Sequence, residues 1–183
     1  CGKMALAHNG KLTNTKQLRE ELIAGNAVFQ TSIDSEVMAL LINRYSDGDI
    51  VQGVIKACAR FQGSFALVVM TADKLIAVRD PFGIRPLVLG KSLDDTVVAS
   101  ETCAIDSIGG TVERDVKPGE VVVIDAEGEH SYFLPKEKKT ASCIFEYVYF
   151  ARPDSIIDGC SVYESRKEAG RILAKYCPVD ADI

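Results

Sequence analysis

The residues best suited to chemistry are the dipeptide Asn9-Gly10 and the carboxylate of Asp34. An Asn side-chain amide and a Gly backbone N–H can point at one spot, and two such donors stabilise the oxyanion of an acyl-transfer reaction. Asn-Gly is also a common turn dipeptide, because both residues tolerate positive φ. Asp34 likewise has two compatible interpretations. It caps a helix, or it binds a cationic group such as the α-ammonium of an amino acid.

The segments around these residues must position them. Residues 3–8 are mostly apolar and predict a buried strand that leads into a turn at Asn9-Gly10. Asn14, with Gln17 three residues later, has the capping-box pattern and predicts the start of a helix. A second amphipathic helix is expected to follow the polar segment around Asp34. A third helix is expected after it, and Asp49 can cap its start.

The pattern then changes from helical to strand-like. Residues 64–70 and 75–78 are two apolar runs separated by a short turn, which predicts a buried hairpin. Residues 79–86 contain two prolines and one glycine and are expected to form a rigid structural turn. The other predicted elements are strands at 87–90, 96–99, 121–124 and 143–150, a short helix at 100–106 and a long helix at 162–176.

Composition narrows the function classes. The 183 residues, 47% of them hydrophobic, suit one sizeable domain, or one domain plus a piece of another. A net charge of −5 with scattered Lys and Arg argues against nucleic acid or a membrane surface as the main partner. The six cysteines form no CxxC pair, which disfavours a zinc ribbon or a redox motif. With no membrane-spanning run and no signal-peptide pattern, a cytoplasmic location is expected.

Two segments together, residues 5–14 and 34–36, resemble the glutaminase domain of the class II glutamine amidotransferases. Three more, at 79–87, 100–104 and 146–155, are similar to the branch of that family that uses phosphoribosyl pyrophosphate in purine synthesis. The resemblance implies an α+β fold of the N-terminal-nucleophile hydrolase type. That fold is an αββα sandwich of antiparallel sheets, which we expect to be incomplete here at its N-terminal side.

The resemblance also implies residue roles. Asn9 and Gly10 match the oxyanion-hole pair, and Asp34 matches the carboxylate that holds the α-ammonium of glutamine. The nucleophile of the family is a terminal cysteine, so Cys1 is a candidate. The alternative is that Cys1 only marks where a fragment begins, because few residues separate it from the Ala-His-Asn-Gly strand. Cys143 aligns with a ligand of the iron–sulfur cluster that some members carry, and we expect it to be structural here.

Residues 1–160 are therefore expected to form a partial glutaminase domain, and residues 161–183 a helix with the start of a phosphoribosyltransferase domain. The implied reaction is glutamine hydrolysis, with the ammonia forming 5-phosphoribosylamine from phosphoribosyl pyrophosphate. No cofactor is expected in this chain, whereas the complete enzyme would use Mg²⁺ and, in some members, the cluster. A homo-oligomer is expected, and the chain alone is expected to be inactive. The alternatives are a non-catalytic amino-acid-binding module on the same fold, or the glutaminase domain of another class II enzyme such as asparagine synthetase.

Overall fold

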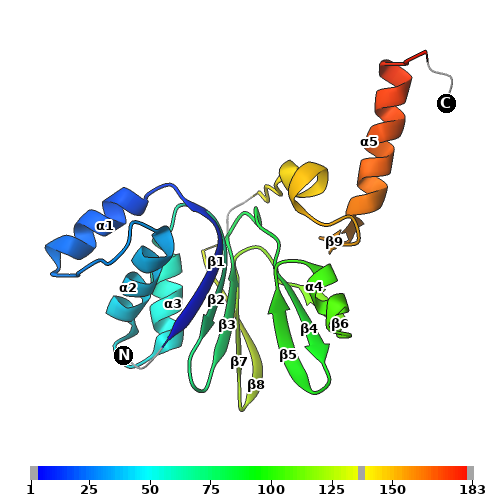
Figure 1. Ribbon diagram of the computed structural model, residues 1–183. Helices are drawn as coiled ribbons and strands as arrows, with labels where there is room; N and C mark the ends of the chain where they lie inside the picture. The colour runs from blue at the N-terminus through cyan, green and yellow to red at the C-terminus, as the bar shows by residue number, and fades with distance from the viewer. Residues whose placement is uncertain (1–3, 136–138, 181–183) are drawn as a thin grey trace. The chain divides into compact units, whose positions relative to one another are not determined.

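The computed structural model describes residues 4–135 and 139–180, which divide into two compact units (Figure 1). The first unit comprises Cys1–Leu87 and Val116–Ser142, and the second Val88–Asp115 and Cys143–Ile183. Within the described residues, no helix is both long enough and apolar enough to span a bilayer.

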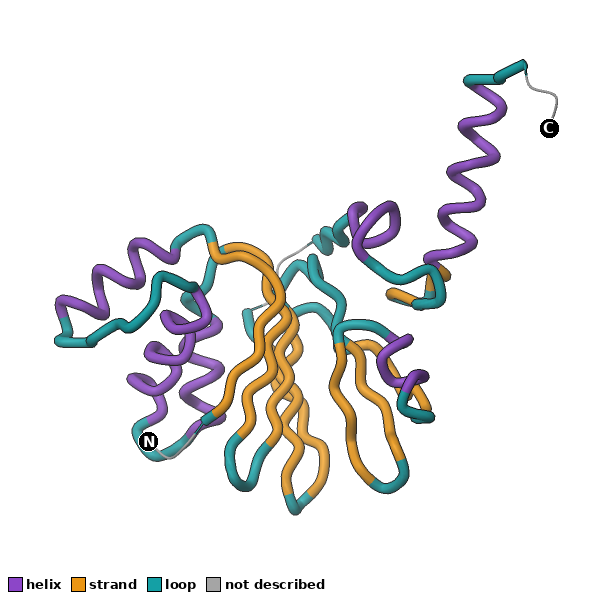
Figure 2. The backbone as a smooth tube through the Cα atoms, viewed as in Figure 1, coloured by secondary structure: helices purple, strands orange, loops and turns teal. Residues whose placement is uncertain are grey.

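The first unit contains a five-stranded antiparallel sheet in the order β1-β2-β3-β7-β8. Its strands are β1 (Ala5–Leu12), β2 (Gly63–Met70), β3 (Leu75–Arg79), β7 (Glu120–Asp125) and β8 (Gly128–Phe133). The helices α1 (Thr15–Ala24), α2 (Asp34–Ser46) and α3 (Ile50–Cys58) lie together on one side of β1 (Figures 1 and 2).

The core of this unit lies between the sheet and the three helices. Alternate residues of β2, namely Phe65, Leu67 and Val69, are fully buried there, as expected for one face of a strand. Burial of each such side chain contributes about 1.5–3 kcal/mol. The predicted hairpin is thus confirmed, and so is the Asp49 cap, which accepts hydrogen bonds from Val51 N (2.9 Å) and from the next amide in α3.

One local prediction at the start of the chain is wrong, and another is confirmed only in part. Asn9-Gly10 is not a turn, because β1 continues through it in register with β2. Gly10 has a φ of 136°, and a Cβ there would lie 2.2 Å from the Ser64 carbonyl oxygen, so glycine serves a close strand contact. The helix predicted to start at Asn14 is confirmed, and Asn14 occupies the N-cap position of α1, but its side chain makes no capping hydrogen bond. Its amide instead donates to the Arg60 carbonyl (2.9 Å) and accepts from the Gln62 amide (3.1 Å).

The turn after β3 depends on two buried charged residues. Asp80 is fully buried and accepts hydrogen bonds from the backbone amides of Phe82 (3.0 Å) and Ile84 (3.1 Å). Arg79, 1% exposed, donates to three backbone carbonyls, those of Gly83, Arg85 and Val116, at 2.8–3.1 Å. The predicted structural turn is confirmed, and its charges satisfy backbone groups that would otherwise be unpaired.

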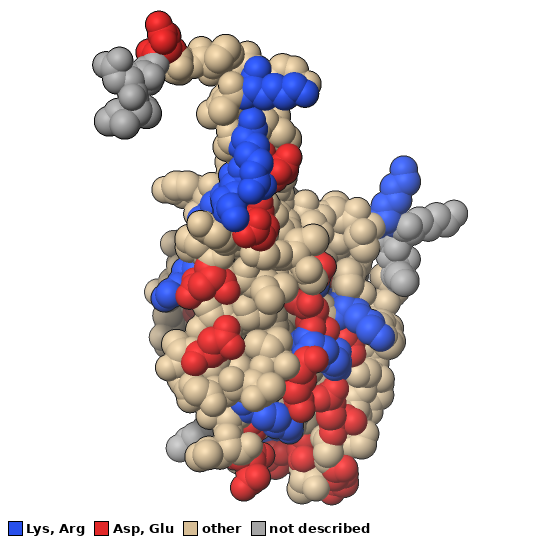
Figure 3. All heavy atoms as spheres, turned by 90° about the vertical axis from the view of Figure 1, so that its right-hand side faces the viewer, with Lys and Arg blue, Asp and Glu red and all other residues tan. Residues whose placement is uncertain are grey.

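The second unit contains a three-stranded antiparallel sheet in the order β5-β4-β6. Its elements are β4 (Val88–Ser92), β5 (Asp95–Ala99), α4 (Thr102–Ser107), β6 (Thr111–Asp115), β9 (Ile156–Ile157), β10 (Cys160–Ser161) and α5 (Val162–Tyr176). The long and short helices are as predicted. Figure 3 shows basic and acidic side chains side by side along α5, in agreement with the Lys167–Glu164 (2.9 Å) and Arg171–Glu168 (3.1 Å) pairs.

The predicted strand at 143–150 is wrong, because this segment is helical and ends in the π-helix η1 (Glu146–Phe150). The Ala151 amide donates to the Glu146 carbonyl (3.0 Å), which closes the wide turn of a π-helix. Glu146 is buried, whereas Tyr149 and Phe150 are exposed. The aromatic composition had suggested a strand, but strand preference depends on packing against neighbouring strands.

Two of the segments on which the family resemblance rests, 100–104 and 146–155, contact each other in the second unit. Glu101 Oε2 accepts hydrogen bonds from the Arg152 amide (2.8 Å) and from Ser155 Oγ (2.7 Å). Next to it, Thr102 Oγ1 accepts from the Ile156 amide (2.9 Å). Segment 100–104 therefore fixes the turn at 152–156, a contact across more than 50 residues that local sequence patterns do not reveal.

The role of Arg79 in fixing the turn after β3 can be tested by Arg79→Met. The change leaves buried carbonyls unpaired, so we expect the free energy of unfolding to fall by about 3 kcal/mol or more. Urea denaturation followed by circular dichroism measures this. The control Arg171→Met, on the exposed side of α5, should change stability by less than about 0.5 kcal/mol. Equal effects of the two substitutions would contradict the structural role of Arg79.

Candidate functional site

The candidate site lies along the edge of β1 that faces away from β2. The Thr13 amide donates toward the end of β2, to the Gln62 carbonyl (2.8 Å), whereas the Leu12 amide points the other way, to Asp34 Oδ2 (3.5 Å). Successive N–H groups of a strand alternate between its two edges. The Gly10 N–H, two residues before Leu12, therefore faces the same edge as the Asp34 carboxylate.

The two predicted oxyanion donors come from adjacent residues of this strand. Asn9 is exposed, whereas His8 and Gly10 lie on the opposite, helix-covered face. The Asn9 side chain thus lies on the exposed face of β1, and the Gly10 N–H lies at its open edge. Both groups come from a strand instead of the predicted turn, and their role as a pair of oxyanion donors remains a prediction.

Asp34 is the first residue of α2, and its side chain is 13% exposed. The interpretation as a helix cap is wrong, because the N-cap position is Ile33 and no side chain caps the helix. The carboxylate instead reaches β1, where Lys11 Nζ lies 3.7 Å and His8 Nδ1 3.8 Å from its oxygens. The helix N-terminus favours its negative charge. Lys11 is 79% exposed, so its attraction contributes less than about 1 kcal/mol.

His8 is the group in this site that sequence reasoning missed. Its side chain is 3% exposed, and its Nε2 is buried without a hydrogen-bond partner among the described residues. Burial lowers the pKa of His8 from its usual value near 6.5, and the positive charges of Lys11 and Arg85 act in the same direction. Asp34 and the Ser64 carbonyl oppose this shift. The imidazole is therefore neutral at pH 7 and leaves the charge of Asp34 available to a cation. The sequence held one indication of this role: residues 8 and 10 are two apart in a strand, so they lie on the same face.

The lowered pKa of His8 predicts a pH dependence of stability. The unfolded chain binds a proton near pH 6.5, whereas the folded chain binds it only at lower pH, so stability falls as the pH drops from 7 through 6.5 toward the folded pKa. Glu21 and Glu36 have lowered pKa values from a reference of 4.5, so their contributions are lost only at more acid pH. His8→Gln should weaken the pH dependence of the free energy of unfolding between pH 7 and 5.5, as measured by urea titration. If the unfolding free energy of this variant depended on pH as in the unchanged chain, burial of His8 would not be the cause of that dependence.

The structure does not test the roles predicted for Cys1 and Cys143. Cys1 lies outside the described residues, so its role as nucleophile stays a prediction. Burial raises the pKa of the Cys58 thiol, which lies in the core and is unsuited to nucleophilic attack. Cys143 is partly buried. Among the residues described, no three His, Cys, Asp or Glu side chains gather where they could hold a metal ion, and a cluster ligand role for Cys143 stays untested.

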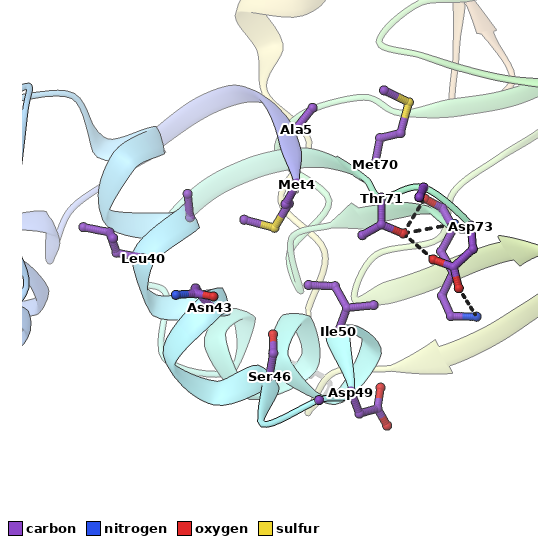
Figure 4. A pocket seen from close by; sticks show the side chains of 14 residues that line it. Met4, Ala5, Leu40, Asn43, Ser46, Asp49, Ile50, Met70, Thr71 and Asp73 are labelled. Carbon is purple, nitrogen blue, oxygen red and sulfur yellow. Dashed lines mark hydrogen bonds and ion pairs between the residues drawn. The ribbon is translucent and has the colours of Figure 1, made fainter. Parts of the chain in front are cut away.

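A separate hollow of about 1330 Å³ opens at the other end of β1 (Figure 4). Met4, Leu40, Ile50 and Met70 give it a largely apolar lining. Several of its polar groups are engaged with the protein. For example, Thr71 Oγ1 donates to an Asp73 carboxylate oxygen at 2.9 Å. None of the predicted site residues that the structure describes lines this hollow. The chemistry-bearing groups instead lie at the β1 edge.

The antiparallel sheets with helices give the chain an α+β fold. Its match to the solved amidotransferase structure described below assigns that fold to the N-terminal-nucleophile hydrolase type. The family model described as "Glutamine amidotransferase domain" matches residues 1–107, more than half of the chain. The chain therefore belongs to the glutamine amidotransferase family, as the sequence resemblance indicated.

Its relatives narrow the family further. The chain is 47% identical over 182 residues to a soybean chloroplastic amidophosphoribosyltransferase, covering 98% of this chain and 32% of that protein. It is 45% identical over 185 residues to an amidophosphoribosyltransferase of Archaeoglobus fulgidus, covering all of this chain and 40% of the relative. The solved structure of the Bacillus subtilis glutamine phosphoribosylpyrophosphate amidotransferase, complexed with ADP and GMP, matches 99% of the chain with a TM-score of 0.94 and 42% identity, over 40% of that protein. The chain thus spans about a third to two fifths of these relatives.

Proposed function

We propose that this chain provides the glutamine-binding part of a glutaminase site within an amidophosphoribosyltransferase. The observation that supports this most directly is the placement of the Gly10 N–H and the Asp34 carboxylate on one edge of β1. A hydrogen-bond donor for the amide oxygen and an anion for the α-ammonium are the two groups that glutamine requires. The amidophosphoribosyltransferase relatives add support for the particular enzyme.

In the proposed reaction, a cysteine thiolate attacks the side-chain amide carbon of glutamine. The amide oxygen becomes an oxyanion that accepts hydrogen bonds from the Asn9 amide and the Gly10 N–H. Collapse of this intermediate expels ammonia and leaves a thioester, which water hydrolyses to glutamate and free thiol. Cys1 is the candidate nucleophile, with its own α-amino group as the base. The ammonia then displaces pyrophosphate from phosphoribosyl pyrophosphate in the complete enzyme.

The oxyanion assignment predicts a split between two activities of the complete enzyme. Asn9→Ala should lower glutamine-dependent synthesis about 10²–10³-fold, because one oxyanion donor is lost. Synthesis from added ammonia should stay within about twofold, because it bypasses the thioester. The measurement is steady-state formation of phosphoribosylamine from each nitrogen source.

Asp34→Asn is the companion variant, because it should raise KM for glutamine while leaving the ammonia-dependent rate unchanged. A change that lowers both activities equally would point to a folding defect or a site elsewhere. In that case the assignment of Asn9 to the oxyanion hole would be abandoned. Binding of glutamine by the domain without any turnover would favour the alternative, a non-catalytic binding module.

A further inference from the structure

Glu36, in the first turn of α2, contacts the loop that leads into Asp34. Glu36 Oε1 accepts a hydrogen bond from the Gln30 amide at 2.7 Å, and its Oε2 accepts one from the Thr31 amide at 2.8 Å. The Thr31 hydroxyl donates to the same Oε2. One side chain therefore binds three donors of the preceding segment, and hydrogen bonds to an ionised acceptor are the stronger kind.

Arg19 on α1 holds the same segment from the other side. Its Nη2 donates to the Thr31 carbonyl at 2.9 Å, and its guanidinium carbon lies 4.0 Å from the centre of the Phe29 ring. The Thr31 hydroxyl also accepts a longer hydrogen bond from the Ile33 amide, at 3.4 Å. The amide, carbonyl and hydroxyl of Thr31 are thus all engaged, three residues before Asp34, which carries the proposed substrate contact.

Burial fixes only the first part of this loop. Ala27 and Phe29 are partly buried against the core, whereas residues 30–33 are all exposed, and the apolar Ile33 is 55% exposed. The body of α2 is anchored independently, because Val37 and Met38 are fully buried. The conformation of the exposed segment 30–33, which leads directly into Asp34, therefore depends on polar contacts more than on the core. The Gln30 amide and the Thr31 hydroxyl lower the pKa of Glu36, which keeps it ionised at neutral pH.

We propose that Glu36, assisted by Arg19, is a positioning residue for glutamine binding, which acts by holding segment 30–33 so that the Asp34 carboxylate faces the edge of β1. This inference rests on the proposed function of Asp34. Glu36 touches no substrate in this account. Its loss should release the loop and the first turn of α2, while the helix body and the oxyanion donors of β1 stay in place.

The test compares Glu36→Ala with Glu164→Ala in the complete enzyme that carries this domain. Glu164 is also a carboxylate in the first turn of a helix, but its side chain contacts Lys167 of its own helix. Glu36→Ala should raise KM for glutamine about tenfold or more, with kcat and the ammonia-dependent rate within about twofold. Glu36→Gln keeps one acceptor oxygen, so its KM for glutamine should lie between those of Glu36→Ala and the unchanged enzyme. Glu164→Ala should have the KM of the unchanged enzyme.

A second readout does not depend on activity. Hydrogen exchange of the 183-residue chain should show faster exchange at the Gln30 and Thr31 amides in Glu36→Ala, with the buried Ile42 amide unchanged. The double variant Asp34→Asn/Glu36→Ala should have the same KM as Asp34→Asn alone, because both act through one carboxylate.

The outcomes separate the two proposals. If Asp34→Asn raises KM but Glu36→Ala does not, the positioning role is wrong and the proposed function stands. If Asp34→Asn leaves KM unchanged, both are wrong. A fall in kcat with unchanged KM in Glu36→Ala would also overturn the positioning role, because it would place the effect on the reacting centre.

Discussion

The close pairing of β1 with β2 at Gly10 is the constraint on which the site depends. The Ser64 carbonyl lies where any side chain of residue 10 would begin, and the backbone there has a φ of 136°. Only glycine fits both conditions without strain. The pairing continues through Leu12, and this register decides which amides face β2 and which face the open edge. A one-residue shift would exchange them and turn the Gly10 N–H away from Asp34.

The charges around Asp34 fit the binding of a cation. The carboxylate lies at the N-terminal end of α2 and beside a histidine that burial keeps neutral. Lys11 is exposed and can yield its place to a substrate ammonium, since a surface ion pair is weak. A buried partner of opposite charge would instead have neutralised Asp34. The environment thus preserves one negative charge close to a backbone donor.

Much of the fold could be predicted from the sequence. Apolar periodicity located the β2–β3 hairpin and α5, and Asp49 marked the start of α3, because in each case the local pattern and the final packing agree. The errors occur where distant contacts override local preference. Asn14 stands at the N-cap position of α1, but its side chain forms hydrogen bonds with Arg60 and Gln62 instead of capping the helix. The segment around Tyr149 has strand-like composition but is helical.

The candidate site was predicted in part. The resemblance supplied Asn9, Gly10 and Asp34, but not the neighbours that control them. The pKa of His8 is lowered by burial, and this burial depends on helices that come later in the chain. Glu36 lies in segment 34–36, on which the resemblance rests, but its hydrogen bonds to Thr31 follow from the course of a loop without regular structure. Strand alternation indicates the face on which His8 lies, whereas no spacing in the sequence indicates the contacts of Glu36.

The most direct test of the account is a crystal structure of the complete enzyme carrying a covalent adduct with an electrophilic glutamine analogue. We expect the α-ammonium within hydrogen-bond distance of the Asp34 carboxylate, and the oxygen derived from the side-chain amide facing the Gly10 N–H and the Asn9 amide. An adduct whose ammonium lies away from Asp34, or whose oxygen faces away from the β1 edge, would contradict the central claim that this edge binds glutamine.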